Sequence, residues 1–294
     1  MTMTLISAAD LAQRLDDPGV CIFDVRHDLA DHGLGRRQFA DAHVPGARFL
    51  DSETELAAPR TGRNGRHPLP APDALAALMA RHGVGPQTLV VAYDASGGAF
   101  AAHLWWMLRW LGHERVVVLD GGWQAWQAAG LPVAQGADAQ GPAAAADARH
   151  DMAAAGASAL RRAPLAQAVD AGAVMANLSD PRFTVLDARA AARYRGEMEP
   201  IDPVAGHIPG ALNRPNSENL TADGRFKPAE QLRQEFTTLL DGRAPESIVH
   251  QCGSGITATH NLLAMEIAGL GGSRLYPGSW SEWVSDPTRP VAKG

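Results

Sequence analysis

Short apolar runs alternate along the whole chain with segments in which apolar residues recur every three or four positions. Apolar runs bounded by polar or glycine-rich turns are typical of buried strands, and the wider spacing is typical of helices. In the first half, the pattern predicts strands at 20–26, 88–93 and 115–119 and helices at 75–82, 101–110 and 123–129. This alternation predicts an α/β fold with a mostly parallel sheet flanked by helices.

The same pattern returns in the second half of the chain, where a strand ending in Asp-x-Arg is again followed by a His-x-Pro-Gly-Ala turn. The matching segments are 22–26 and 183–189, 43–47 and 207–211, 89–94 and 247–252, and 119–123 and 275–280. Four blocks in the same order indicate the duplication of a domain of about 130 residues. We predict domains at 1–134 and 158–294, joined by an Ala/Gly-rich linker at 135–157.

The most informative stretch runs from Ile248 to Ala258, where a predicted strand meets a predicted helix through a loop that begins at Cys252. Gly253 and Gly255 punctuate this loop. Backbone N–H groups of such a loop can converge on one point, and the start of the helix adds positive potential there. Both effects favour a thiolate, so the sequence predicts that Cys252 is a nucleophile and not only a small buried residue.

Composition narrows the class of protein. The chain has 294 residues, of which 46% are hydrophobic and 20% charged, with a net charge of −6. The absence of a basic block argues against nucleic acid and against an anionic membrane surface as partners. Cys21 lies within a predicted strand, so neither a disulfide framework nor a Cys-based metal site is indicated. We expect no signal peptide and a cytoplasmic location, where an active thiol stays reduced.

At this point the chain resembles the two-domain sulfurtransferases of the rhodanese and 3-mercaptopyruvate sulfurtransferase type. The resemblance rests on four segments that occur in order, namely Asp187-x-Arg189, 206–211, 252–258 and 278–283. It implies two tandem rhodanese-like domains, of which the first lacks the catalytic cysteine because Asp94 stands in its place. It also implies that Cys252 accepts a sulfane sulfur as a persulfide and passes it to an acceptor, with no cofactor and no metal.

The resemblance also suggests roles for other residues. Backbone amides at Gly253, Gly255, Ile256 and Thr257 would hold the donor or the persulfide. Ser254 follows a glycine where thiosulfate-preferring members usually carry basic residues, and this favours 3-mercaptopyruvate as donor.

Two residues of the first domain match positions of the mercaptopyruvate subgroup. These residues, His67 and Glu53, would form with Ser254 a catalytic proton relay at the interface between the domains.

Arg193 matches the arginine that holds the donor anion, since a guanidinium binds a carboxylate or thiosulfate through two hydrogen bonds. The mercaptopyruvate subgroup usually carries a second arginine shortly afterwards, but Ile201 stands near that position. This departure keeps thiosulfate open as the alternative donor. The acceptor, whether cyanide, a small thiol or a thioredoxin-like protein, is not indicated by the sequence.

Two other classes of protein are less compatible with the sequence. A cysteine phosphatase requires Cys-x5-Arg, and the sixth residue after Cys252 is Ala258. A non-catalytic binding or regulatory module would be expected to lose the cysteine, as the first half has done. The Asp-x-Arg pair Asp187 and Arg189, together with His43 and His207 of the His-x-Pro-Gly turns, is expected to be structural, because equivalents occur in both halves.

Overall fold

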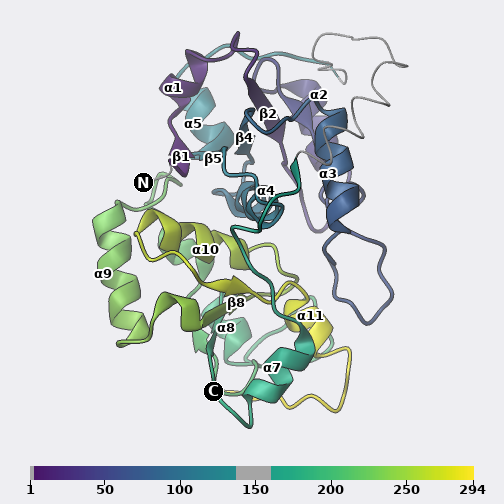
Figure 1. Cartoon of the computed structure of the whole chain (residues 1–294), viewed down its shortest axis with the longest axis vertical. Coiled ribbons are helices and arrows are strands. Elements are labelled where there is room, and N and C mark those ends of the chain that lie inside the picture. The colour runs from purple at the N-terminus through teal and green to yellow at the C-terminus, as the bar shows by residue number, and fades with distance from the viewer. Residues whose placement is uncertain (1–2, 137–159) are drawn as a thin grey trace. The chain divides into compact units, whose positions relative to one another are not determined.

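The computed structural model describes residues 3–136 and 160–294, and Figure 1 shows its ribbon. The chain forms two compact units, one from residues 1–58 and 70–165 and the other from residues 59–69 and 166–294. The segment 59–69 therefore packs with the C-terminal half of the chain although it lies in the N-terminal half of the sequence. The predicted linker falls outside the described residues except for positions 135 and 136.

The first unit is built on a parallel sheet in the order β1-β5-β4-β2-β3. Its strands are β1 (Leu5–Ile6), β2 (Val20–Asp24), β3 (Arg48–Phe49), β4 (Leu89–Tyr93) and β5 (Val116–Leu119). Its helices are α1 (Ala8–Ala12), α2 (Leu34–Asp41), α3 (Pro72–Arg81), α4 (Ala99–Trp110) and α5 (Gly122–Ala128). The pattern of apolar runs predicted β2, β4 and β5, because these strands are buried along nearly their whole length.

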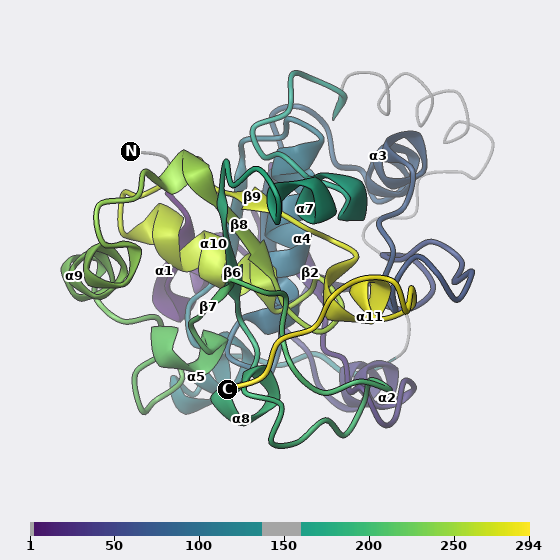
Figure 2. The ribbon, with the colours of Figure 1, turned by 90° about the horizontal axis from the view of Figure 1, so that it is seen from below.

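The second unit repeats this plan with a parallel sheet in the order β7-β6-β8-β9. Its strands are β6 (Thr184–Asp187), β7 (Leu212–Asn213), β8 (Ile248–Gln251) and β9 (Arg274–Leu275). Its helices are α7 (Ala171–Asn177), α8 (Ala191–Tyr194), α9 (Ala229–Leu240), α10 (Ala258–Ile267) and α11 (Ser279–Trp283), with 3-10 turns at Asn216–Asn219 and Pro245–Ser247. Figure 2 shows β6 and β8 side by side with α10 lying on them.

The duplication extends to details that the sequence pattern did not reveal. Ala168 forms a parallel bridge to Leu275 in the second unit, at the place where β1 pairs with β5 in the first. His43 and Ala134 form an antiparallel bridge, and His207 and Ala292 form its counterpart. These bridges confirm that both halves follow one fold.

The Asp-x-Arg pairs are structural in both units, as predicted. The Arg189 guanidinium donates to both carboxylate oxygens of Asp187 and to the carbonyl of Gly206, and it lies 4.6 Å from the centre of the Trp280 ring. In the first unit, Arg26 makes the same contacts with Asp24, Ala42 and Trp123. Such fully paired buried charges tie a strand end to the following turn.

The histidines of the two His-x-Pro-Gly turns are also structural. The Nδ1 atom of His43 lies 2.7 Å from the Phe39 carbonyl oxygen, and the ring stacks on Phe39. His207 repeats this arrangement, with Nδ1 at 2.8 Å from the carbonyl oxygen of Tyr194 and its ring stacked on that tyrosine.

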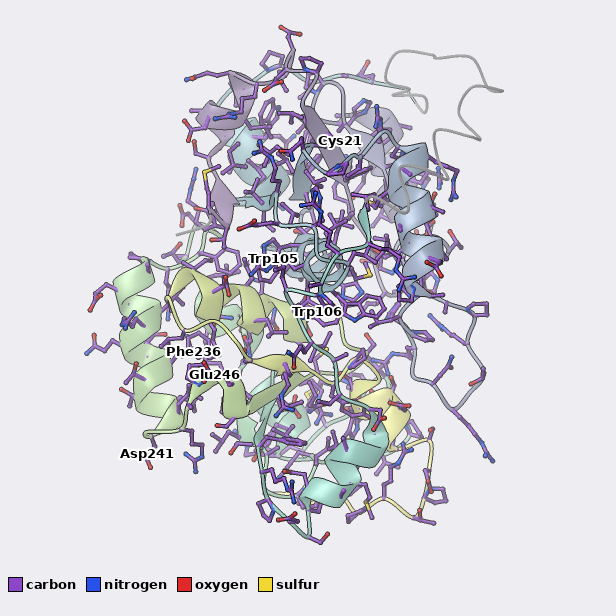
Figure 3. The ribbon with its side chains drawn as sticks, viewed as in Figure 1. Cys21, Trp105, Trp106, Phe236, Asp241 and Glu246 are labelled. Carbon is purple, nitrogen blue, oxygen red and sulfur yellow. The ribbon has the colours of Figure 1, made fainter. Side chains whose placement is uncertain are left out.

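Aromatic side chains fill much of the interior of each unit. Trp105 and Trp106 project from α4 and are almost fully buried, and Phe236 of α9 is completely buried in the second unit (Figure 3). Trp280 and Trp283 of α11 are likewise buried, and they belong to the core cluster that includes Val249 of β8. The strand β8, which precedes Cys252, is thus fixed by close packing against the tryptophans of α11. Within the described residues, no helix is both long and apolar enough to cross a membrane.

Candidate active site

Cys252 lies in the loop between β8 and α10, at the carboxyl end of the sheet of the second unit. Ligands of open parallel α/β sheets bind at this end of the strands. The cysteine is 1% exposed, and its Sγ atom accepts a hydrogen bond from the N–H of Gly255 over 3.2 Å. Gly255 has a φ of +92°, and a Cβ atom there would lie 2.2 Å from the carbonyl oxygen of Pro277. Only glycine fits this position, because both the backbone angle and the close carbonyl exclude a side chain.

The neighbouring helix α11 fixes the backbone of the cysteine loop. The N–H of Cys252 donates to Ser279 Oγ over 3.0 Å, and its carbonyl accepts from the N–H of Trp280. The carbonyl of Gly253 accepts from the N–H of Ser281. Three hydrogen bonds from one helix thus hold the loop in one conformation. Pre-organised N–H groups of this kind stabilise an anion without any rearrangement during the reaction.

The corresponding loop of the first unit, which begins at Asp94, shows how its backbone N–H groups surround an acidic side chain. Asp94, which stands in the place of Cys252, accepts backbone hydrogen bonds from Ser96, Gly98, Phe100 and Ala101 over 2.7–2.9 Å. The same loop geometry therefore gathers N–H groups around an anionic side chain in the unit that lacks the thiol. This supports the expectation that the loop of the second unit can hold a thiolate or persulfide.

Two arginines lie against the loop of Cys252. The structure places Arg193 of α8 and Arg66 of segment 59–69 beside Gly253, where a Cβ atom would lie 2.8 Å from Arg66 Nη2 and 3.6 Å from Arg193 Nη1. The sequence interpretation singles out Arg193 but not Arg66. Ile201, near the position where a second arginine is expected, is 46% exposed, and Arg66 places a second guanidinium beside Gly253. The signal that could have identified Arg66 is its position directly before His67.

Both arginines are neutralised by carboxylates of the loop that follows α8. Arg193 donates to Glu199 through Nε over 3.1 Å and through Nη2 over 2.6 Å, and it also contacts Asp202 Oδ2 at 3.2 Å. Arg66 pairs with the other oxygen of Asp202. Burial raises the pKa of the Asp202 carboxyl above its usual range despite the two arginines. Burial also acts on Glu199, but hydrogen bonds from Arg193 and the backbone outweigh it and lower the pKa of Glu199.

His67 and Ser254 lie in the same compact unit as Cys252, since segment 59–69 packs with the C-terminal half. His67 is 3% exposed and Ser254 is 7% exposed, so both are shielded from water. The backbone N–H of Arg66 donates to Ser281 Oγ over 3.0 Å, which fixes the segment that carries His67 to α11. The sequence predicts His67 on the first domain, whereas the structure groups it with the second unit.

The remaining predicted loop residues occupy the start of α10. Ile256 is 3% exposed, and its carbonyl accepts a hydrogen bond from Thr259 Oγ1 over 2.6 Å. Thr257 is the residue at the N-cap position of α10. With Gly253 and Gly255, these residues form the backbone of the turn around the sulfur.

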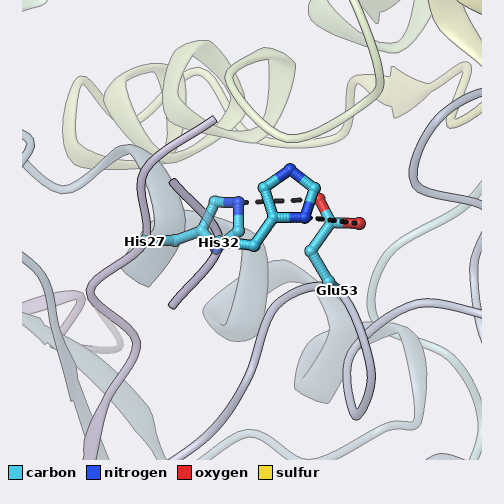
Figure 4. Close-up of side chains that lie close together, drawn as sticks. All are labelled: His27, His32 and Glu53. Atoms are coloured by element: carbon cyan, nitrogen blue, oxygen red, sulfur yellow. Dashed lines mark ion pairs between the residues drawn. The ribbon is translucent and has the colours of Figure 1, made fainter. Parts of the chain in front are cut away.

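Glu53 belongs to the first unit, where its carboxylate faces two neighbouring imidazoles (Figure 4). Its Oε1 atom is 3.5 Å from Nε2 of His27, and its Oε2 atom is 4.0 Å from Nδ1 of His32. Among the described residues, this group is the one that could offer three ligand atoms to a metal, with those atoms within 4.8 Å of one another. In this structure the cluster is a carboxylate shared by two histidines.

Comparison with known proteins gives this geometry a context. The model of the rhodanese-like domain matches the chain twice, at residues 7–129 and 170–286. A Pseudomonas aeruginosa protein with the provisional name 3-mercaptopyruvate sulfurtransferase is 47% identical over 99% of this chain and 98% of its own length. A Mycobacterium tuberculosis protein that is provisionally named thiosulfate sulfurtransferase SseB is 39% identical over 99% of this chain and 97% of its own length.

The solved structures agree in fold. The crystal structure of SseA from Escherichia coli, described as a 3-mercaptopyruvate sulfurtransferase, is 30% identical and covers 95% of this chain and 99% of its own, with a TM-score of 0.76. The 3-mercaptopyruvate sulfurtransferase from Leishmania major has a TM-score of 0.79 at 29% identity over 98% of this chain and 76% of its own.

Proposed function

Because the chain belongs to the rhodanese family and is a sulfurtransferase with two rhodanese-like domains, we propose that it transfers a sulfane sulfur from 3-mercaptopyruvate to a thiophilic acceptor through a persulfide on Cys252. The observation that carries this proposal is the pair Arg66 and Arg193 beside Gly253, directly after the buried cysteine. Two guanidiniums offer the planar, forked donors that a carboxylate needs. The Mycobacterium relative with the thiosulfate name keeps thiosulfate as the second candidate donor.

In the first half-reaction, the Cys252 thiolate attacks the sulfur of the donor and the bond from sulfur to carbon breaks. The electron pair of that bond moves onto the substrate as the enolate of pyruvate. The enolate then takes up the proton that the donor thiol has lost, and this gives pyruvate and the anionic persulfide of Cys252. The N–H groups of the loop, including that of Gly255, hold the negative charge on sulfur.

His67 and Ser254 are the proposed carriers of this proton. Both are shielded from water and belong to the unit of Cys252. A histidine suits the task, because its ordinary pKa lies near neutrality. Glu53 remains the proposed acidic partner of this relay, on the basis of the family resemblance, and in the first unit its carboxylate is already shared by His27 and His32.

In the second half-reaction, the acceptor attacks the outer sulfur and the S–S bond breaks, which returns the thiolate of Cys252. Cyanide would leave as thiocyanate, and a thiol would leave as its own persulfide. We propose a small thiol, cyanide or a thioredoxin-like protein as acceptor, and a reducing compartment such as the cytoplasm as location. The proposal requires no resident metal or organic cofactor.

The experiment that tests the donor is a comparison of kcat/KM for 3-mercaptopyruvate and thiosulfate, with cyanide as acceptor and Cys252→Ser as the blank. A higher value for 3-mercaptopyruvate supports the proposal. A higher value for thiosulfate would transfer the assignment to the second candidate. Activity with neither donor above the blank would contradict sulfur transfer by this site.

A further inference from the structure

Asp202 bridges the two arginines to which the donor anion is assigned under the proposed function. Its side chain is 4% exposed, and each of its two carboxylate oxygens faces a different arginine. Oδ1 accepts from Arg66 Nη1, and Oδ2 accepts from Arg193 Nη2 over 3.2 Å. A carboxylate that bridges two guanidiniums reproduces the way in which such a pair binds a keto-acid.

This bridge lies directly beside the catalytic loop. The missing side chain of Gly253 leaves the space that the two guanidiniums fill, since a Cβ atom there would lie 2.8 Å from one and 3.6 Å from the other. Asp202 is bound by Arg66 Nη1 and Arg193 Nη2, so a donor carboxylate bound by the arginine atoms that face Gly253 would share both guanidiniums with a second negative charge. Asp202 and the donor would therefore compete for the positive charge of the pair.

The loop that carries Asp202 has a separate anchor. Glu199 holds Arg193 by two hydrogen bonds, contacts Arg189 at 3.3 Å and accepts the N–H groups of Ile201 and Asp202 over 3.1 Å each. Loss of the Asp202 contacts would leave these bonds in place. The Asp202 side chain can thus turn away from the arginines while its backbone N–H stays bound to Glu199.

Asp202 is also the less well stabilised of the two carboxylates. Its contact with Arg193 is 3.2 Å, whereas Glu199 makes two shorter ones, and its other partner is Arg66. Burial acts against the ionised form of Asp202, and the negative charge of Glu199 repels it.

We propose that Asp202 is an internal competitor of the donor, which holds Arg66 and Arg193 in the empty enzyme and is displaced when an anionic donor binds. This inference rests on the proposed function, because it assigns the two arginines to the donor. Asp202 thereby becomes a residue that determines donor affinity. Only an anion that pairs with both arginines replaces what Asp202 provides, so neutral thiols are excluded from the site.

The test measures binding of pyruvate, the non-reacting product anion, to the full chain by calorimetry in a Cys252→Ser background. Asp202→Asn keeps the shape of the side chain and removes its charge, so we expect pyruvate to bind about tenfold more tightly. The matched control is Glu197→Gln, which removes an exposed carboxylate of the same loop that pairs with Arg195. This control should leave the affinity unchanged.

The sign of the change decides between two roles. If Asp202 served to position the arginines for the donor, its loss would weaken the binding of pyruvate, and unchanged or weaker binding overturns the proposal. Asp202→Ala repeats the test in case the amide of Asn itself binds an arginine, and thermal unfolding checks that each variant is folded.

In the active enzyme, Asp202→Asn should lower KM for both donors and leave kcat nearly unchanged. If the enzyme turned over neither donor, the proposed function would fail, while the binding measurement would still decide the role of Asp202.

Discussion

The replacement of Arg66 tests the donor site at the residue that the sequence did not reveal. In Arg66→Ala, the donor carboxylate loses one of its two guanidiniums, while Arg193 remains. A hydrogen bond to a charged group contributes about 1.5–3 kcal/mol. The Arg66 side chain is 22% exposed, so solvent weakens its interactions and the lower part of this range applies. At about 1.4 kcal/mol for each factor of ten, kcat/KM should fall roughly 10- to 50-fold.

The assay is steady-state sulfur transfer to cyanide with each donor in turn. The loss should appear mainly in KM, because the arginine binds a carboxylate that does not take part in bond breaking. Arg66→Lys keeps the charge but not the fork, so it should recover part of the loss. Arg63→Ala is the control, since Arg63 is an exposed arginine of the same segment. If Arg66→Ala stays within about twofold of this control, the two-arginine site is wrong.

The remaining predictions concern the relay, the loop and pH. His67→Gln should lower kcat with 3-mercaptopyruvate about 100-fold or more. Turnover of thiosulfate should change little, because sulfite leaves without taking up a proton. Equal losses of kcat with both donors would contradict the proton relay. Gly255→Ala should destabilise the protein by more than ~3 kcal/mol in urea titrations, because the new Cβ atom would lie 2.2 Å from the Pro277 carbonyl oxygen. Gly242 has a similar positive φ of +79° but no atom near its Cβ position, so Gly242→Ala should cost only about 1 kcal/mol. Similar losses of stability in the two variants would show that the clash at Gly255 is relieved. Burial lowers the pKa of His250 to about 3 in the folded chain, so between pH 6.5 and pH 3 the unfolded state binds a proton that the folded state does not. The free energy of unfolding should therefore fall by up to about 1.4 kcal/mol for each pH unit as the pH is lowered through this range. His250→Gln should reduce this slope, and an unchanged slope would refute the assignment to His250.

The sequence predicted the parts of this structure that depend on local pattern. The strands β2, β4, β5 and β8 are continuous buried runs, and the duplicated order of motifs correctly indicated two α/β units. The short strand β1 was missed, because two residues in a sheet carry no readable period. The 12-residue helix α9 was missed as well, although Leu232, Phe236 and Leu240 follow a helical spacing.

The candidate site was predicted only where a motif marks it. Cys252 and its loop carry a local signal, because a glycine-rich turn between strand and helix is visible in the sequence. Arg66 belongs to no motif and is marked in the sequence only by its position before His67, since its place beside Gly253 depends on how segment 59–69 packs against α11 through Gly65 and Ser281. Glu53 was chosen by resemblance, and its histidine neighbours His27 and His32 come from a different segment of the first unit. Contacts between distant segments of this kind are set by tertiary packing and not by local pattern.

The central claim is that Cys252 carries the sulfur, and the most direct measurement is the mass of the intact protein after it has reacted with a donor and been freed of excess reagent. The account predicts the gain of one sulfur atom, located on the peptide of Cys252 and released as thiocyanate by cyanide. Cys252→Ser should gain none, and Cys21, which is buried and whose pKa is raised by that burial, should stay unmodified. Sulfur bound elsewhere, or transfer that persists in Cys252→Ser, would contradict the account.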